Sequence, residues 1–108
     1  RDIANVTQQI LEQGIKTGSL KQFLEHHTGI YNLTGVGVTS WHGFAKAIFD
    51  ELHNQGKNVA KLNAISTDAY PTPAKRPQYS CLDNTKLVNA FGIRLPDWHT
   101  SLSMAMKN

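Results

Sequence analysis

The sequence has little cysteine and no long apolar run. Cys81 is the only cysteine among 108 residues, so the chain can form neither an internal disulfide nor a zinc site built on several cysteines. Its apolar runs are only a few residues long, so we expect no transmembrane segment and no signal peptide. These absences predict a cytoplasmic protein, kept in a reducing compartment, without a membrane partner.

The chain also lacks a cluster of cations and a good set of metal ligands. Its net charge of +3 comes mostly from dispersed lysines, whereas binding to a nucleic-acid backbone needs clustered cations, so we predict no nucleic-acid partner. His26 and His27 would face apart on a helix. His42 and His53 would stand about 16 Å apart along a helix at 1.5 Å per residue. We therefore predict no metal site.

The composition is otherwise that of an ordinary globular domain. The hydrophobic content is 40% and the charged content is 18%. A chain of 108 residues has room for one domain with a modest core. It opens at Arg1 without a methionine, directly in a helical pattern, and we therefore expect a piece of a longer protein.

Apolar residues recur at helical spacing in most of the chain. Thr39 or Ser40 is a natural N-cap for the clearest helix, and Gly14, Gly56 and Gly92 are expected to end helices. Trp41 and Trp98 lie on apolar helix faces, so we expect both to be buried. The pattern predicts helices over residues 2–13, 20–26, 41–55 and 84–91, and one that begins at Pro96.

Two short segments favour strands. Residues 30–34 are β-prone and alternate, and residues 59–65 form a second apolar run after the helix that begins near Trp41. Strand, helix and strand in that order predict a short parallel pair with a right-handed crossover. The predicted fold class is therefore α+β, a small and mostly helical lobe with one short parallel strand pair.

Motifs for redox chemistry are incomplete in this chain. Residues 35–40, GVGVTS, resemble half of a dinucleotide-binding loop, but Ser40 occupies the position of the third glycine. None of the three tyrosines has a lysine four residues later, as a reductase Tyr-Lys pair would need. Cys81 has no evident base nearby, so we predict a buried or half-buried structural thiol. The sequence indicates no catalytic and no cofactor-binding residue.

A proline-rich segment, residues 70–83, is the strongest candidate for a binding site. Prolines at 71, 73 and 77 exclude a helix or a central strand and predict a stiff loop. The loop carries the adjacent cations Lys75 and Arg76, flanked by Tyr70 and Tyr79. A rigid loop that presents a guanidinium suits a phosphorylated ligand, since arginine forms bidentate hydrogen bonds. The alternative is a surface loop on which Arg76 is only a solvated charge.

The motifs resemble those of a known family. The segment YPTPAKRPQYSCLD at residues 70–83 is the most specific block, and it follows IYNL at 30–33 and TSWHGFAKAIF at 39–49. Lys86-Leu87 and LPDW at 95–98 complete the series. In this order and spacing, the blocks resemble the C-terminal part of the dTDP-4-dehydrorhamnose reductase family, an extended branch of the short-chain dehydrogenases.

The resemblance implies a two-lobe oxidoreductase that reduces dTDP-4-dehydro-L-rhamnose to dTDP-L-rhamnose, a precursor of cell-surface polysaccharides such as lipopolysaccharide O-antigen. An upstream Rossmann-type lobe would bind NADPH or NADH and carry the catalysis. Residues 1–108 would be the substrate-binding lobe, inactive alone, with the dTDP-sugar and the upstream lobe as partners and with homodimerisation open. Arg76 would contact the diphosphate, Lys75 would add positive charge, and Tyr70 and Tyr79 would line the cleft.

Two other hypotheses remain open. The chain is either a non-catalytic nucleotide-sugar-binding or regulatory module of the same ancestry, or part of another nucleotide-sugar reductase or epimerase. A glycine-rich loop and a Tyr-x-x-x-Lys motif upstream of Arg1 would favour an enzyme over the first alternative. Substrate profiling of the complete protein would distinguish the second alternative from a dTDP-4-dehydrorhamnose reductase.

Overall fold

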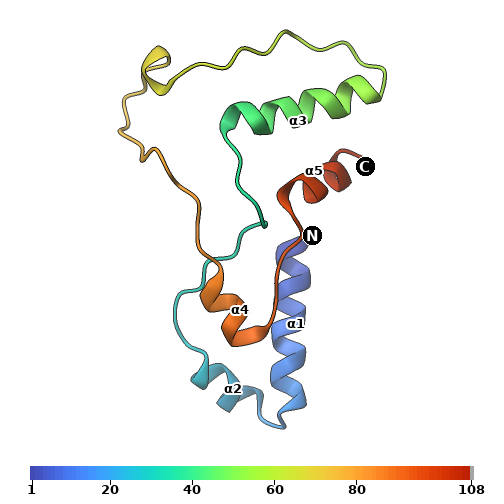
Figure 1. Ribbon diagram of the computed structural model, residues 1–108. Helices are drawn as coiled ribbons and strands as arrows, with labels where there is room; N and C mark the ends of the chain where they lie inside the picture. Colours follow the sequence, from blue (N-terminus) through green and yellow to red (C-terminus); the bar gives the residue numbers. More distant parts are fainter. Residues whose placement is uncertain (108) are drawn as a thin grey trace. The chain divides into compact units, whose positions relative to one another are not determined.

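The computed structural model describes residues 1–107, without the side chain of Thr67. The helices follow one another with irregular connections (Figure 1). None of the helices in the described residues is long and apolar enough to cross a membrane. The elements are α1 (Asp2–Lys16), α2 (Leu20–His26), α3 (Trp41–Asn54), the 3-10 turn η1 (Thr67–Ala69), α4 (Thr85–Phe91) and α5 (Trp98–Met106).

The chain divides into two compact units. The first unit combines residues 1–36 with residues 82–96, and so contains α1, α2 and α4. The second combines residues 37–81 with the segment from Asp97 onward, and so contains α3, η1 and α5. Each unit is therefore assembled from two separate stretches of the sequence.

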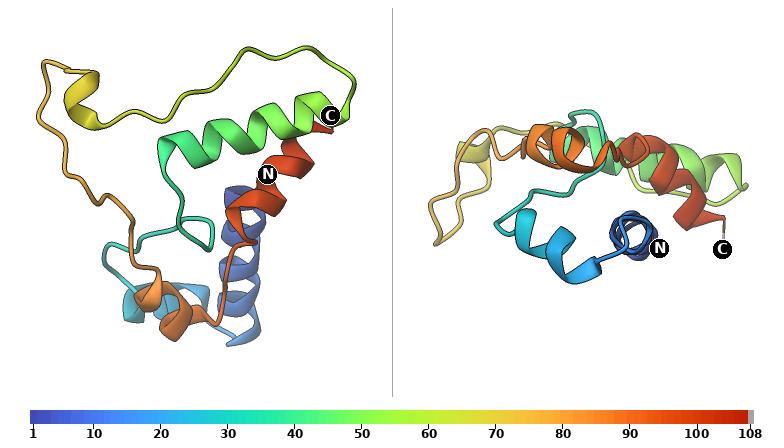
Figure 2. Two further views of the ribbon diagram at one scale, coloured as in Figure 1. Left: turned by 45° about the horizontal axis from the view of Figure 1, so that its top comes forward. Right: turned by 90° about the horizontal axis from the view of Figure 1, so that it is seen from below.

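The first unit has a small apolar core around Phe91. Figure 2 shows α1 and α2 side by side, joined by a short turn. The Phe91 ring packs against the rings of Phe23, His27 and Tyr31, with centroid distances of 6.0, 5.0 and 5.3 Å. Gly92 ends α4 with φ 65°, as predicted, and its N–H donates to the Val88 carbonyl. The buried core residues are Val6, Leu87, Phe91 and Ile93.

Gly14 does not end the first helix, so that prediction was wrong. The helix continues to Lys16, and the turn that follows contains Gly18 with φ 87°. Gly14 is buried, and a Cβ atom there would lie 2.6 Å from Leu20 Cδ1 and 2.8 Å from Phe23 Cδ1. The missing side chain at Gly14 therefore allows α2 to pack closely on α1.

The predicted parallel strand pair was also wrong. Apart from single-residue bridges, residues 1–107 contain no strand, and residues 30–34 and 59–65 are both irregular. Val59 and Ile65 are 38% and 62% exposed, and Leu62 between them is half-buried, so none of the three apolar side chains is fully buried as in a sheet core. The part of the fold class that holds is the mostly helical character.

Residues 30–34 satisfy their backbone with side chains of the α4 region instead of a partner strand. Asn84 Oδ1 accepts from the Thr34 backbone N–H (3.1 Å), and Asn84 Nδ2 donates to the Thr34 carbonyl oxygen (2.9 Å). Lys86 Nζ donates to the Ile30 carbonyl oxygen (2.9 Å) and lies 4.4 Å from the Tyr31 ring centroid. Backbone N–H and carbonyl groups need a hydrogen-bond partner, which can be a side chain as well as a neighbouring strand. Tyr31 and Leu33 are half-buried without a sheet.

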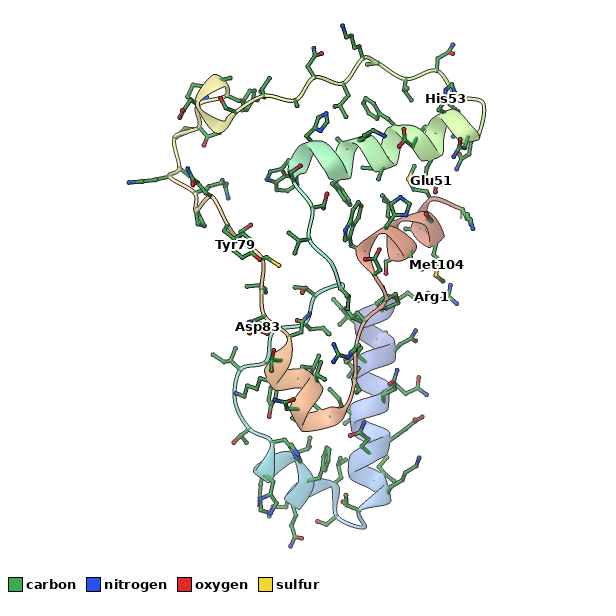
Figure 3. The ribbon with its side chains drawn as sticks, in the orientation of Figure 1. Arg1, Glu51, His53, Tyr79, Asp83 and Met104 are labelled. Carbon is green, nitrogen blue, oxygen red and sulfur yellow. The ribbon has the colours of Figure 1, made fainter. Side chains whose placement is uncertain are left out.

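In the second unit, α3 and α5 pack together. Ser40 caps α3, as predicted, because its hydroxyl accepts from the Gly43 N–H (3.0 Å). The rings of Phe44 and Trp98 lie 5.9 Å apart. Glu51, labelled in Figure 3, accepts a hydrogen bond of 2.8 Å from the Ser103 hydroxyl of α5.

The two tryptophans differ in their environment. Trp98 is half-buried against Phe44, which agrees in part with the prediction that it is buried. Trp41 is 89% exposed, so the prediction that it lies in the core was wrong. Trp41 is the first residue of α3 and lies at the end of the apolar stripe, where helical periodicity does not determine whether another element covers it.

Candidate functional site

The proline-rich segment is an irregular, exposed loop. Each residue from Tyr70 to Asp83 is exposed, and no helix or strand forms between η1 and α4. The prediction of a loop is confirmed. Proline has no N–H and a fixed φ, and it disfavours helical conformations at the preceding residue, so three prolines prevent regular structure here. A local hydrogen bond from the Thr72 hydroxyl to the Ala74 carbonyl (3.0 Å) shapes the turn before Lys75.

The two cations of the loop form no ion pair within the described residues. Lys75 and Arg76 are exposed, and within residues 1–107 the ion pair that the structure contains joins Lys46 to Asp50 on α3, at 2.9 Å. No carboxylate of the described chain therefore neutralises Arg76. Its five N–H donors are available to a planar anion such as a phosphate or a carboxylate.

Tyr70 and Tyr79 flank these cations along the loop. Their side chains are 70% and 72% exposed, so both rings present a face and a hydroxyl to solvent. The pKa of Tyr79 is raised above its usual value of 10.0. The main cause is a hydrogen bond with the Cys81 side chain, followed by an unfavourable electrostatic interaction of the tyrosinate with Cys81. Tyr79 therefore stays a neutral hydrogen-bonding group at physiological pH.

Cys81 is exposed, so the prediction of a buried or half-buried thiol was wrong. The interaction with Tyr79 is local, two residues away in the sequence. The four predicted binding residues thus lie in a stretch of ten residues, all of them solvent-accessible and two of them cationic.

The residues that follow the loop form a hydrogen-bonded start to α4. Asp83 Oδ1, on the side chain labelled in Figure 3, accepts from the Thr85 N–H (2.8 Å) and from the Thr85 hydroxyl. These bonds lower the pKa of Asp83 below 3.8, with the Thr85 hydroxyl as the larger cause. The Asp83 carbonyl accepts from Asn32 Nδ2 (3.2 Å). Asp83 is therefore a structural carboxylate at the start of a helix.

The described loop presents two exposed cations, Lys75 and Arg76. Within residues 1–107, no group of three or more histidine, cysteine, aspartate or glutamate side chains could hold a metal ion. The exposure of Trp41 was not predicted from the sequence. Its position directly after the N-cap Ser40, where the helix has no preceding turn to cover the indole, is the signal that could have found it.

Comparisons with known proteins agree with the motifs. The family described as "RmlD substrate binding domain" matches residues 1–108. A protein of Aggregatibacter actinomycetemcomitans named dTDP-4-dehydrorhamnose reductase is 48% identical over 103 residues, which cover 94% of this chain and 33% of that protein. A protein of Burkholderia thailandensis with the same name is 36% identical over 112 residues, covering 100% of this chain and 37% of that protein.

A more distant relative has a different name. The spore coat polysaccharide biosynthesis protein SpsK of Bacillus subtilis is 35% identical over 81 residues, which cover 75% of this chain and 27% of that protein. The chain spans about a third of the length of the curated relatives it matches. Since the family match extends over residues 1–108, this chain belongs to the RmlD substrate binding domain family.

Proposed function

We propose that this chain is the C-terminal substrate-binding lobe of a dTDP-4-dehydrorhamnose reductase, an enzyme that reduces dTDP-4-dehydro-L-rhamnose to dTDP-L-rhamnose. The single observation that carries the proposal is the family match, together with relatives of that name over nearly the whole chain. SpsK, named for polysaccharide biosynthesis, supports a role in making precursors of cell-surface polysaccharides.

The remainder of the enzyme supplies the redox chemistry in this proposal. A nucleotide-binding lobe upstream of Arg1 holds NADPH or NADH and the groups that transfer hydride and proton. The lobe described here binds the sugar nucleotide and limits the access of water to it. The lone cysteine fits a reducing compartment, so we place the reaction in the cytoplasm. Homodimerisation is compatible with this arrangement.

The proline-rich loop is the part of this chain that we assign to the diphosphate. Arg76 forms bidentate, charge-assisted hydrogen bonds to phosphate oxygens, and Lys75 adds a positive charge without fixed geometry. The prolines restrict the loop before binding, which reduces the conformational entropy lost on binding. Tyr70 and Tyr79 line the site. The exposure of all four side chains and the absence of a carboxylate at Arg76 within residues 1–107 support this assignment.

The test is the substitution Arg76→Ala in the complete protein. A hydrogen bond to a charged group contributes about 1.5–3 kcal/mol, so KM for the dTDP-sugar should rise about 10- to 150-fold, with a smaller effect on kcat. Arg94→Ala is a matched control, because Arg94 is also exposed but lies after α4 in the first unit. An unchanged KM and kcat for Arg76→Ala would remove the assignment of Arg76.

A further inference from the structure

Trp41 is an aromatic side chain that the fold leaves uncovered. At 89%, it has the largest exposed fraction among the large hydrophobic side chains of residues 1–107. An indole has a large apolar surface, and tryptophan is usually highly buried on average. Trp98, by contrast, is half-buried against Phe44 in the same unit. The exposed ring at the start of α3 is therefore available to a ligand or a partner.

The fold brings the proline-rich loop to the same end of the second unit as Trp41. After α3 the chain runs back past this helix, and η1 lies beyond the N-terminal end of α3 in Figures 1 and 2. Tyr70 directly follows η1, and Trp41 is the first residue of α3. Trp41 and Tyr70 thus lie at the same end of the second unit, and the loop with Lys75 and Arg76 begins at that end.

Apolar side chains next to Trp41 in the sequence are also partly exposed, although less than the indole. Thr39 and Ser40, which precede it, are polar and exposed, while Ile48 on the same helix face is half-buried. Phe44, one turn further on, packs against Trp98 of α5. Val38 and Phe44 are 64% and 37% exposed, so the indole is the most exposed of a few apolar side chains here, and its planar face has the shape on which a nucleobase stacks.

We propose that Trp41 provides the surface on which the nucleobase of the sugar nucleotide stacks. The inference rests on the proposed function, in which the loop binds the diphosphate of the same ligand. A nucleoside diphosphate offers an anionic part, suited to a guanidinium, and a planar base, suited to an aromatic face. Trp41 is then a binding residue for the thymine, and it takes no part in the chemical step.

The test measures nucleotide binding to the complete protein by calorimetry, with dTDP and inorganic pyrophosphate as probes. Base stacking contributes enough that Trp41→Ala should weaken dTDP binding about 5- to 150-fold. Pyrophosphate has no base, so its affinity should not change. Trp41→Phe keeps an aromatic face and should retain most of the dTDP affinity. Trp98→Phe is the matched control and should bind dTDP as the parent protein does.

Fluorescence supplies a second measurement that does not depend on the alanine variant folding. Addition of dTDP to the parent protein should quench tryptophan emission, and this quenching should be lost in Trp41→Phe but not in Trp98→Phe. If Trp41→Ala lowers Tm and leaves dTDP binding unchanged, Trp41 packs against another part of the protein and the proposal is wrong. Equal loss of dTDP and pyrophosphate affinity would also contradict it, since stacking acts on the base alone.

The same titrations separate this inference from the proposed function. If Arg76→Ala weakens dTDP binding while Trp41→Ala does not, the diphosphate assignment stands and only the stacking proposal fails. If Trp41→Ala weakens dTDP binding and Arg76→Ala does not, the base contact stands and the role of Arg76 fails. If neither variant changes the affinity for dTDP, both assignments are wrong.

Discussion

The side chain of Asn84 replaces a strand partner, and its removal should open residues 30–34. Its amide makes hydrogen bonds to both backbone groups of Thr34, at 3.1 Å to the N–H and 2.9 Å to the carbonyl oxygen. It also contacts the Thr34 hydroxyl at 3.0 and 3.3 Å. In Asn84→Ala, all of these bonds are lost while the helix that follows keeps its own backbone hydrogen bonds.

The magnitude follows from the number of bonds and their exposure. A hydrogen bond contributes about 0.5–1.5 kcal/mol net, and two of these bonds are to the backbone of the half-buried Thr34. The free energy of local opening should therefore fall by about 1–3 kcal/mol. Since 1.4 kcal/mol corresponds to a factor of ten, the amide of Thr34 should exchange with deuterium about 5- to 150-fold faster.

Hydrogen exchange of the complete protein, followed by mass spectrometry over peptides that contain residues 30–36, measures this effect. Asn32→Ala is the control, because Asn32 is exposed and donates one bond, to the Asp83 carbonyl oxygen. That variant should leave the exchange of Thr34 nearly unchanged. If Asn84→Ala also leaves it unchanged, side-chain hydrogen bonding does not hold this segment and the account of the missing sheet is refuted.

Two further predictions concern the first unit. In Gly14→Ala, helix propensity gains about 1 kcal/mol, but the new Cβ would lie 2.8 Å from the Phe23 ring, which His27 and Phe91 hold in place. We therefore expect the free energy of unfolding in urea to fall by about 1 kcal/mol. Asn5→Ala, at an exposed position of the same helix, is the control and should not destabilise the protein. A Gly14→Ala protein that is more stable than the parent would show that α2 does not pack closely on Gly14. For Asp83, NMR titration should give a pKa below 3.8, and Thr85→Ala should raise it toward that value. Because the pKa of the folded state is the lower one, the carboxylate stabilises the fold above pH 3.8, and this contribution is lost as the pH falls through the folded pKa. A pKa that does not respond to Thr85→Ala would refute the cause.

The sequence predicted the helices better than the contacts that the helices and connecting segments make with one another. Ser40 and Gly92 act within one turn of the backbone, so their roles as N-cap and αL residue could be predicted and are confirmed. Gly14 could not be interpreted in the same way, because a glycine that ends a helix and one that admits a neighbouring helix look alike in a sequence. The alternating segment 30–34 predicted a strand, because the amide of Asn84, which replaces a strand partner, lies 50 residues away from Thr34 in the sequence.

The candidate site was predictable in one respect. The prolines predicted that the segment with Lys75 and Arg76 is a loop without helix or strand, and this is confirmed. The exposure of Trp41 and Cys81 was not predicted, since apolar character favours burial without specifying what covers a residue. The roles of Tyr70, Lys75, Arg76 and Tyr79 in binding a ligand remain predictions that the experiments above test.

The division into two units has a consequence for engineering the protein. The polypeptide passes from one unit to the other after Val36, again after Cys81, and a third time after Pro96. Neither unit can be cloned as one contiguous fragment, and a truncation between residues 37 and 81 would remove part of both. Recombination between related genes should therefore keep both units intact only when it exchanges all the residues of this chain together.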